Sequence, residues 1–266
     1  MRLLASISCV VLSLYLIAGC TTSPTGRSQL NLFGNTLDKQ GVAAFTALKQ
    51  KLPTSTNPST NQLVQCVVDS LTPVVDAKYS TQNWEVVVFD DEQINAFAVP
   101  GGKIGVYTGI LNVAQTPDQL AAIIGHEIGH VIAQHASERA SIQLGTQAFL
   151  LGTQVAMQAN EMSVAEQQTY MSILGLGTQV GVNLPYSRTH ESEADLIGLE
   201  LMVLAGYSPY AAVELWQNMS AAKDSQKVPP ELLSTHPSAG TRIRDLHNAI
   251  PKVAKQYAGQ IKNNNC

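Results

Sequence analysis

Two histidines and a glutamate lie within five residues of one another, in the segment His126-Glu127-Ile128-Gly129-His130. Residues four apart on a helix project from one face, so the two imidazoles can bind one zinc ion at about 2 Å. Glu127 lies one residue further round the helix, where it can take a proton from a water at the ion and return it to a leaving amine. This spacing is typical of the helix that carries the zinc of a peptide hydrolase.

A helix can also carry two histidines at this spacing without binding a metal. The context favours a metal site, because Thr116 and Gln119 predict a capping box and Pro117 suits the first helical position. Apolar residues that can bury the helix recur along it: Leu120, Ile123, Ile124, Ile128 and Val131. Burying the two histidines and Glu127 among them costs free energy unless something binds these side chains.

A catalytic zinc needs a third protein ligand and one open position. His135 lies too far along the same helix to join the pair. The segment from Glu191 to Asp195 is the strongest source, because these two carboxylates are four residues apart and share a helix face. One can bind zinc while the other orients a ligating histidine. Acidic residues in a first turn can also simply stabilise the helix dipole, and spacing alone does not choose between Glu191 and Glu193.

The separated motifs together resemble the CAAX-prenyl-protease-type metallopeptidase family, in its soluble periplasmic lipoprotein branch. The resemblance covers about residues 25–250. Besides the histidine motif and the acidic segment, it rests on Arg188, on Gly198 and on Asn95 to Gly102, which is similar to the family's edge strand and turn. It implies that Glu191 is the third ligand, that Asp195 is its partner and that each chain binds one zinc ion. It also implies an α+β fold, a mostly helical, gluzincin-like zincin domain with a small β-sheet packed over the active-site helix.

A fourth motif is Ser234-Thr235-His236-Pro237, with Arg242 after it. The resemblance implies that His236 faces the zinc, as a regulatory ligand or as a donor to the transition state, and that Arg242 supports it or the oxyanion. A fourth protein ligand closes a zinc site, so this loop is a candidate switch. Taken without the resemblance, His236 can equally be an ordinary residue of a proline-rich loop.

The N-terminus has the pattern of a secretion signal. Arg2 precedes an apolar run from Leu3 to Ile17, and a small pair then leads directly to Cys20. The pattern resembles a bacterial lipobox, which implies cleavage before Cys20, acylation of that residue and, because Thr21 follows, an outer-membrane lipoprotein facing the periplasm. An ordinary signal peptide or an uncleaved anchor helix are the alternatives, although the run is short for a membrane span. We expect a signal peptide at 1–19, a lipidated tether at 20–37 and the zinc metallopeptidase domain at 38–266.

The cysteine count predicts one disulfide. The chain from residue 20 onward contains Cys20, Cys66 and Cys266. With Cys20 acylated, an even pair remains in an oxidising compartment. We therefore predict a Cys66–Cys266 disulfide that holds the C-terminus.

Patterns along the chain predict strands in the first half only, followed by helices, an order that indicates α+β. The expected strands are 84–89, 96–99 and 104–107. The expected helices are 37–51, 62–77, 116–141, 189–205, 208–223 and 238 to beyond 250, with a breaker stretch at 53–61. Residues 142–184 are apolar and predict a long helix with a break around 175–181. We expect this segment to be a core helix rather than a lid or a membrane-facing element.

Composition limits the choice of function. The chain is 45% hydrophobic and 14% charged, as in a globular domain, and its net charge of −4 with no basic face argues against nucleic acid as a partner. The resemblance implies polypeptide substrates, in particular unfolded or misassembled envelope proteins, and Ala96 to Val99 is the strand along which they can add. A lipid-anchored assembly factor or chaperone with a mostly closed zinc site is the alternative, but such a protein has no need of Glu127. Hydrolysis of a peptidoglycan amide is a third possibility, and we find no wall-binding module in the sequence.

Overall fold

The computed structural model describes residues 19–79, 83–224, 239–260 and 266. Within it the chain forms two compact units, each built from two stretches of sequence. The first unit consists of Met1–Gly34 and Gln134–Thr189, and the second unit of Asn35–Ala133 and His190–Cys266. Among the residues singled out above, the motif at 234–237, which contains His236, and the N-terminal run at 2–17 lie outside the described residues.

The second unit contains a three-stranded sheet in the order β3-β5-β4. Strand β3 (Glu85–Phe89) pairs in parallel with β5 (Lys103–Tyr107), and β4 (Ala96–Val99) pairs antiparallel with β5. Gly101 and Gly102 form the turn between β4 and β5 with φ of 87° and 72°, values that glycine adopts without a steric penalty. The three predicted strands are therefore confirmed, and β4 lies at an edge of the sheet.

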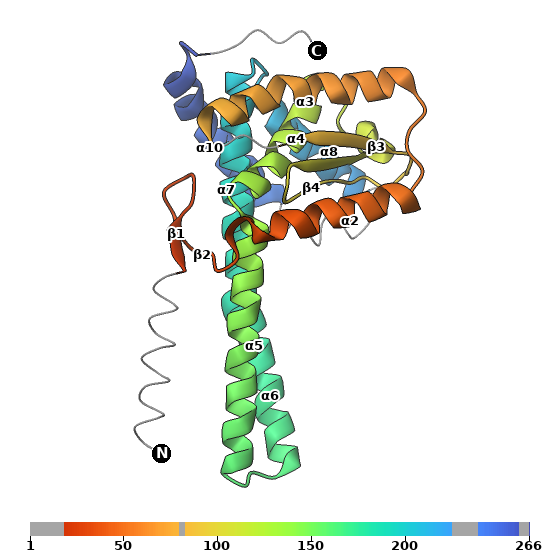
Figure 1. Cartoon of the computed structure of the whole chain (residues 1–266). Coiled ribbons are helices and arrows are strands. Elements are labelled where there is room, and N and C mark those ends of the chain that lie inside the picture. Colours follow the sequence, from red (N-terminus) through yellow and green to blue (C-terminus); the bar gives the residue numbers. More distant parts are fainter. Residues whose placement is uncertain (1–18, 80–82, 225–238, 261–265) are drawn as a thin grey trace. The chain divides into compact units, whose positions relative to one another are not determined.

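Helices pack against this sheet and against one another (Figure 1). In chain order they are α2 (Asp38–Lys51), α3 (Pro58–Lys78), the short η2 (Thr108–Asn112), α4 (Pro117–Ile132), α8 (Tyr210–Asp224) and α10 (Ala239–Tyr257), together with the second-unit part of α7 (Leu184–Leu204). Helix α3 begins earlier than its periodicity indicates, because the Asn57 side chain accepts hydrogen bonds from the first-turn amides of Ser59 and Thr60. The α+β class is confirmed.

One hydrophobic core joins the sheet to α3, α4, α7, α8 and α10 of the second unit. Its largest fully buried side chains include Leu71, Ile104, Ile124, Ile197 and Met202. Helix α4 contacts both β4 and α8, so the helix that carries the two histidines lies under the edge of the sheet. This confirms the expected packing of a small sheet over that helix.

The predicted disulfide is present. Cys66 in α3 is bonded to Cys266, with their Cα atoms 5.8 Å apart and 200 residues between them in sequence. The bond ties the last residue of the chain to a helix of the second unit's core.

The predicted single helix from Thr116 to about Ser141 is wrong. Helix α4 ends at Ile132, and α5 (His135–Ala159) begins after Gln134. Gln134 has a φ of 55°, a left-handed conformation that interrupts helical hydrogen bonding. No glycine or proline marks this break in the sequence.

The first unit begins with a small hairpin, in which β1 (Cys20–Thr22) pairs antiparallel with β2 (Ser28–Leu30). Arg27 donates hydrogen bonds of 2.8 and 2.7 Å to the two carboxylate oxygens of Glu138 in α5, which is fully buried. The amide of Leu32 donates to the hydroxyl of Ser141, also in α5. The start of the segment expected to be a tether thus has regular structure and is fixed to α5.

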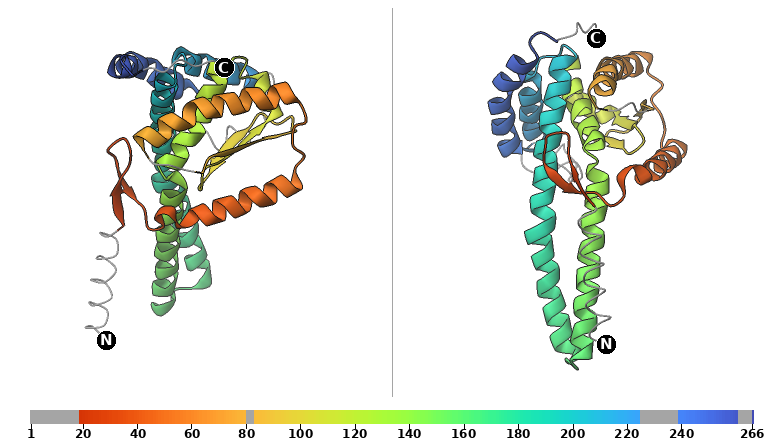
Figure 2. Two further views of the ribbon diagram at one scale, coloured as in Figure 1. Left: turned by 45° about the horizontal axis from the view of Figure 1, so that its top comes forward. Right: turned by 60° about the vertical axis from the view of Figure 1, so that its left-hand side comes forward.

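The rest of the first unit is a helical hairpin of α5 and α6 (Val164–Thr178), seen side by side in the right-hand view of Figure 2. The chain turns at Asn160 to Ser163, where Ser163 and Glu166 form a capping box that starts α6. The expected break around 175–181 is confirmed only in part: α6 ends at Thr178 within this range, but a π-helical turn, η3 (Gln179–Asn183), continues there into α7.

The expectation of a buried core helix over 142–184 is also wrong. The structure describes every residue of α6, and none of them is buried. In α5, only Ile142 and Met157 are buried beyond Ser141. Within the described residues, no helix has the length and apolar character needed to cross a bilayer.

Candidate metal centre

Helices α4 and α7 of the second unit approach each other so closely that their backbones are in contact. A side chain at Gly198 of α7 would lie 2.8 Å from the amide nitrogen of His126, and one at Gly129 of α4 would lie 2.9 Å from the carbonyl oxygen of Ala194. Gly125 faces the backbone of Gly198 in the same way, at 3.2 Å. Small residues on both helices therefore bring the histidine-bearing turn of α4 against the acidic turn of α7.

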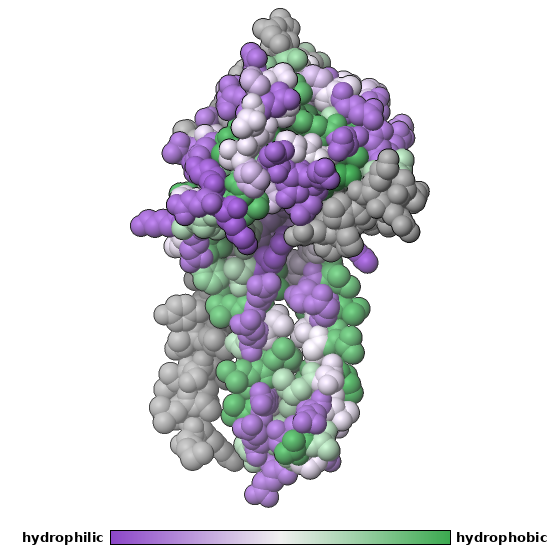
Figure 3. Space-filling view, turned by 90° about the vertical axis from the view of Figure 1, so that its right-hand side faces the viewer, coloured by the Kyte–Doolittle hydropathy of each residue, from purple (hydrophilic) through white to green (hydrophobic). Residues whose placement is uncertain are grey.

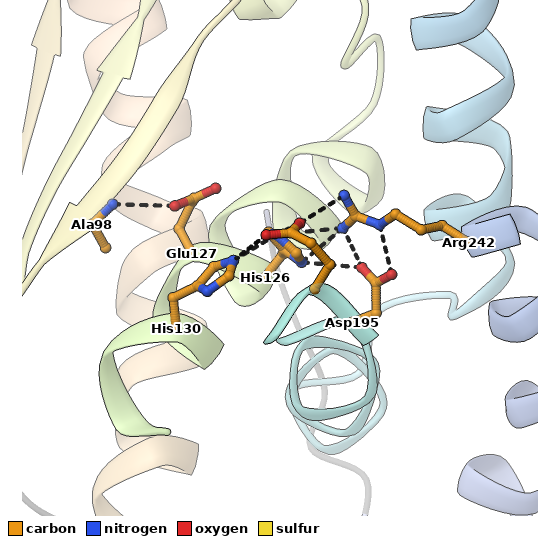
Figure 4. A network of polar contacts seen from close by, with 7 residues as sticks. Ala98, His126, Glu127, His130, Asp195 and Arg242 are labelled. Atoms are coloured by element: carbon orange, nitrogen blue, oxygen red, sulfur yellow. Dashed lines mark hydrogen bonds and ion pairs between the residues drawn. The ribbon is translucent and has the colours of Figure 1, made fainter. Parts of the chain in front are cut away.

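Three potential metal ligands meet at this crossing (Figure 4). The Nε2 atoms of His126 and His130 are 3.1 Å apart, and carboxylate oxygens of Glu191 lie 3.3 Å from the first and 3.4 Å from the second. A four-coordinate ion with ligands at about 2.0 Å holds neighbouring ligand atoms about 3.3 Å apart. The donor set thus has the composition and spacing that a metal ion requires, and within the described residues it is the one group of such side chains close enough together to hold an ion.

The carboxylates around His126 make this position attractive to a positive charge. Burial and the nearby Arg242 both lower the pKa of His126, but hydrogen bonds with Asp195 and Glu191 outweigh them and raise it to about 9. The Nδ1 atom of His126 lies 3.0 Å from Oδ1 of Asp195, so a proton on Nδ1 would direct the lone pair of Nε2 towards the other two ligand side chains. Asp195 thereby orients the ring.

Arg242 from α10 contacts the carboxylates of both Glu191 and Asp195. Its Nε donates to Oδ2 of Asp195 at 2.7 Å and its Nη1 to Oε2 of Glu191 at 3.1 Å, while Nη2 also pairs with Asp195. Its guanidinium lies 3.6 Å from the centre of the Trp216 ring, and only 3% of the residue is exposed. Burial alone would raise the pKa of Asp195, but Arg242 and His126 hold it below its usual value.

Glu127 lies on the side of α4 that faces the sheet. The amide of Ala98 in the edge strand β4 donates a hydrogen bond of 3.3 Å to Oε2 of Glu127 (Figure 4). A small pocket adjoins it, and apart from His126 and Glu127 its lining is apolar: Ala96, Ile110, Ile123, Leu215, Trp216 and Met219. The carboxylate is therefore next to both a strand edge and an apolar pocket.

The structure brings together most of the residues expected to form the site. His126, His130 and Glu191 form the cluster, Asp195 and Arg242 contact it, and Glu127 lies beside His126 along α4. Glu193, which spacing alone left as an alternative ligand, is buried but is not part of the cluster of described residues. Arg242 binds the two carboxylates, whereas the sequence suggested support of His236 or an oxyanion.

Sequence reasoning did not identify two contributors, Trp216 and the close approach of Gly125 and Gly129 to α7. The Gly-x-x-x-Gly spacing around His126 is a signal for the second of these. No pattern in the sequence points to Trp216 as the surface on which Arg242 lies.

Two histidines one turn apart on a helix, a glutamate from a second helix and a sheet edge above them define a zincin-like metallopeptidase fold. The chain belongs to peptidase family M48, whose family model matches residues 58–250. The mitochondrial metalloendopeptidase OMA1 of Schizosaccharomyces pombe is 35% identical over 174 residues, which make up 65% of this chain and 49% of that protein.

Two further relatives come from distant organisms. The mitochondrial metalloendopeptidase OMA1 of Bos taurus is 37% identical over 180 residues, 65% of this chain and 34% of that protein. The beta-barrel assembly-enhancing protease of Yersinia pestis is 26% identical over 208 residues, 76% of this chain and 41% of that protein. The chain thus spans half or less of the length of these relatives.

Proposed function

We propose that this protein is a zinc-dependent endopeptidase, anchored by lipid in the bacterial cell envelope, that cleaves misfolded or misassembled envelope proteins. The observation that carries the proposal is the triangle of His126, His130 and Glu191, with sides of 3.1 to 3.4 Å, next to Glu127. Two imidazoles and one carboxylate are a donor set that suits zinc. A binding protein would have no use for Glu127 beside such a set.

The roles of the residues follow from their positions. His126, His130 and Glu191 would hold the ion, which would supply Lewis acidity that makes water easier to deprotonate and a carbonyl easier to attack. Glu127 takes up the proton of the attacking water and delivers it to the leaving amine. Asp195 and Arg242 keep the ligands in place, because each contacts a ligand and not the reacting atoms.

Substrate binding is assigned to β4. This strand pairs on one side with β5, and the amide of Ala98 points from its other side to Glu127. A polypeptide that adds along this edge has its backbone beside the general base. Recognition through the backbone places few demands on sequence, which suits a protease that acts on unfolded chains.

The envelope location rests on the N-terminal pattern and on a relative. Cys20 is exposed and takes no part in the disulfide, so its sulfur is accessible to acylation. The Yersinia pestis relative is named for enhancing assembly of β-barrels. Sorting to the outer membrane and membership of the periplasmic lipoprotein branch belong to the same proposal.

The test compares zinc content and casein hydrolysis of the chain from residue 20 onward, with Cys20→Ala, and of further variants in this background. We expect one zinc per chain and hydrolysis in the parent, and full zinc content with activity lowered by about 10²- to 10⁴-fold in Glu127→Gln. Glu191→Gln should lose zinc, whereas its matched control Glu193→Gln should keep it. Zinc binding without hydrolysis in the parent would instead favour an assembly factor with a closed site. If the parent protein contains no zinc, the proposal is wrong.

A further inference from the structure

The α5–α6 hairpin exposes apolar side chains that no described residue of the first unit covers. Of the fourteen large hydrophobic residues exposed in the described part of the chain, all but Leu32, Val42 and Tyr210 lie between 144 and 186. The most exposed of them include Leu151 at 62%, Ile173 at 61% and Leu176 at 67%. Figure 3 shows hydrophobic surface along the hairpin, which occupies its lower half. Such a concentration marks a surface that meets an apolar partner.

Exposed apolar residues of α5 form one row along the helix, and Phe149, 55% exposed, lies outside this row. Leu144, Leu151 and Val155 recur at helical spacing on its exposed side, and Ala148 falls in the same row. Its glutamines form a separate row, at 143, 147, 154 and 158. The helix is thus amphipathic although neither row is covered by α6, and this is the pattern of a helix that lies at a boundary between water and a nonpolar phase.

The hairpin carries almost no charge. Between Arg139 and Arg188 the sequence contains no lysine or arginine, and its two acidic residues are Glu161 and Glu166. Both are at the turn between the helices, where Glu166 is held by the capping box with Ser163. A partner that binds this surface must therefore be recognised through nonpolar contact, because there is little charge to recognise it by.

The N-terminal segment indicates which nonpolar phase this is. The apolar run from Leu3 to Ile17 is followed by two small residues and then by Cys20, and Cys20 begins strand β1 of the same unit. The ion pair of half-buried Arg27 with fully buried Glu138 fixes the β1–β2 hairpin to the first turn of α5. The point at which a membrane-directed segment joins the chain is therefore rigidly attached to the helix with the exposed apolar face.

We infer that the α5–α6 hairpin is a lipid-binding element that docks its apolar face into the surface of a bilayer. The inference is independent of acylation, because the hairpin supplies its own nonpolar contact. The absence of basic residues predicts that binding needs no anionic lipid and that salt does not weaken it.

The test uses the chain from residue 20 onward, with Cys20→Ala, and vesicles of phosphatidylcholine and phosphatidylethanolamine, with or without phosphatidylglycerol. We expect cosedimentation that changes by less than about twofold with phosphatidylglycerol or salt. Changing Leu151, Val155, Ile173 and Leu176 together to Gln should weaken binding by at least about tenfold. Val42→Gln with Tyr210→Gln is the matched control in the second unit and should bind like the parent. All proteins should have equal zinc content, which reports intact folding.

A second measurement tests the orientation. With Cys20 replaced and Cys66 and Cys266 joined, Val155→Cys and Gln154→Cys each introduce a single thiol for an environment-sensitive dye. Vesicles should shift the emission of the dye to the blue at 155 and far less at 154, on the glutamine row. The inference would be overturned by equal emission shifts at the two positions or by a lack of vesicle binding. It would also be overturned if the four-residue variant bound vesicles as well as the parent. If the parent instead self-associates without lipid and the four-residue variant does not, the surface binds a second copy of the chain and the inference is wrong.

Discussion

Arg242 is the residue on which the second layer of the metal centre depends. It bridges Glu191, a ligand, and Asp195, which orients another ligand, and it does so while almost wholly buried against Trp216. Two carboxylates and a guanidinium in such a place stabilise the site only as a complete set, because removal of one member leaves a buried charge unpaired. We therefore assign Arg242 to positioning and not to contact with the substrate.

Arg242→Gln should weaken zinc binding by about 10- to 100-fold, since Glu191 loses the group that fixes its carboxylate. Competition with a chromogenic chelator measures this affinity. Arg244→Gln is the matched control. Arg244 lies two residues after Arg242 on the same helix, where it is exposed and pairs with Asp245. Equal zinc affinity in the two variants would show that Arg242 does not position the ligands.

Met219 lines the apolar pocket beside Glu127 and should influence which side chain is accepted next to the cleaved bond. Met219→Phe reduces the space in the pocket, so we expect kcat/KM to fall by about tenfold for peptides with Phe at this position relative to peptides with Ala. Paired peptides that differ at that one residue measure the ratio, and zinc content checks that the site is intact. An unchanged ratio would mean that this pocket does not receive a substrate side chain.

At the scale of elements, the site exists because α4 and α7 cross at backbone contact. The three positions that allow this are Gly125, Gly129 and Gly198, each facing main-chain atoms of the opposite helix. Main-chain atoms cannot rotate away as a side chain can, so an added methyl group must separate the helices. Separation moves His126 and His130 away from Glu191.

Gly198→Ala should lower the free energy of unfolding by about 1–3 kcal/mol and also reduce zinc occupancy. Gly145→Ala in α5 is the control, since a methyl group there meets no atom within 4 Å, and it should raise stability by about 0.5–1 kcal/mol through helix propensity. Urea unfolding with metal analysis measures both effects. A Gly198→Ala protein with normal stability and zinc content would contradict the role given to the crossing.

Features set by local sequence were predictable, and those set by tertiary contact were less so. The capped start of α4, the strands and the histidine pair follow from residues near one another in sequence. Glu191 and Glu193 differ only in which side of α7 faces α4, so spacing could not separate them. The break at Gln134 has no glycine or proline that would predict it. The burial of residues 142–184 could not be predicted, because an apolar pattern does not show which other part of the protein, if any, covers the helix.

At the scale of the whole chain, the Cys66–Cys266 bond closes a loop that contains the entire site. Such a bond stabilises mainly by restricting the unfolded chain, and the effect increases with loop length. The C-terminal helix α10, which supplies Arg242, lies just before the bonded terminus. The disulfide therefore limits how far this helix can move away.

Replacing Cys66 and Cys266 together by Ser should lower the free energy of unfolding by about 2–4 kcal/mol. Urea unfolding of the oxidised parent and of the double variant measures the difference, and the parent under reducing conditions should resemble the variant. Identical unfolding midpoints for all three would indicate that the bond contributes no stability.

The sequence position of the ligands has a consequence for the order of folding. His130 and Glu191 lie on either side of the insertion 134–189, so the chain must close this long segment before three ligands can meet. Loop closure of a disordered segment costs entropy, but α5 and α6 form a hairpin from local contacts, which are made early. By returning the chain on itself, the hairpin shortens the effective loop and allows α7 to find α4. Three ligands can hold a metal ion only after that encounter, so we expect the centre to be completed late in folding, when most of the chain has already formed.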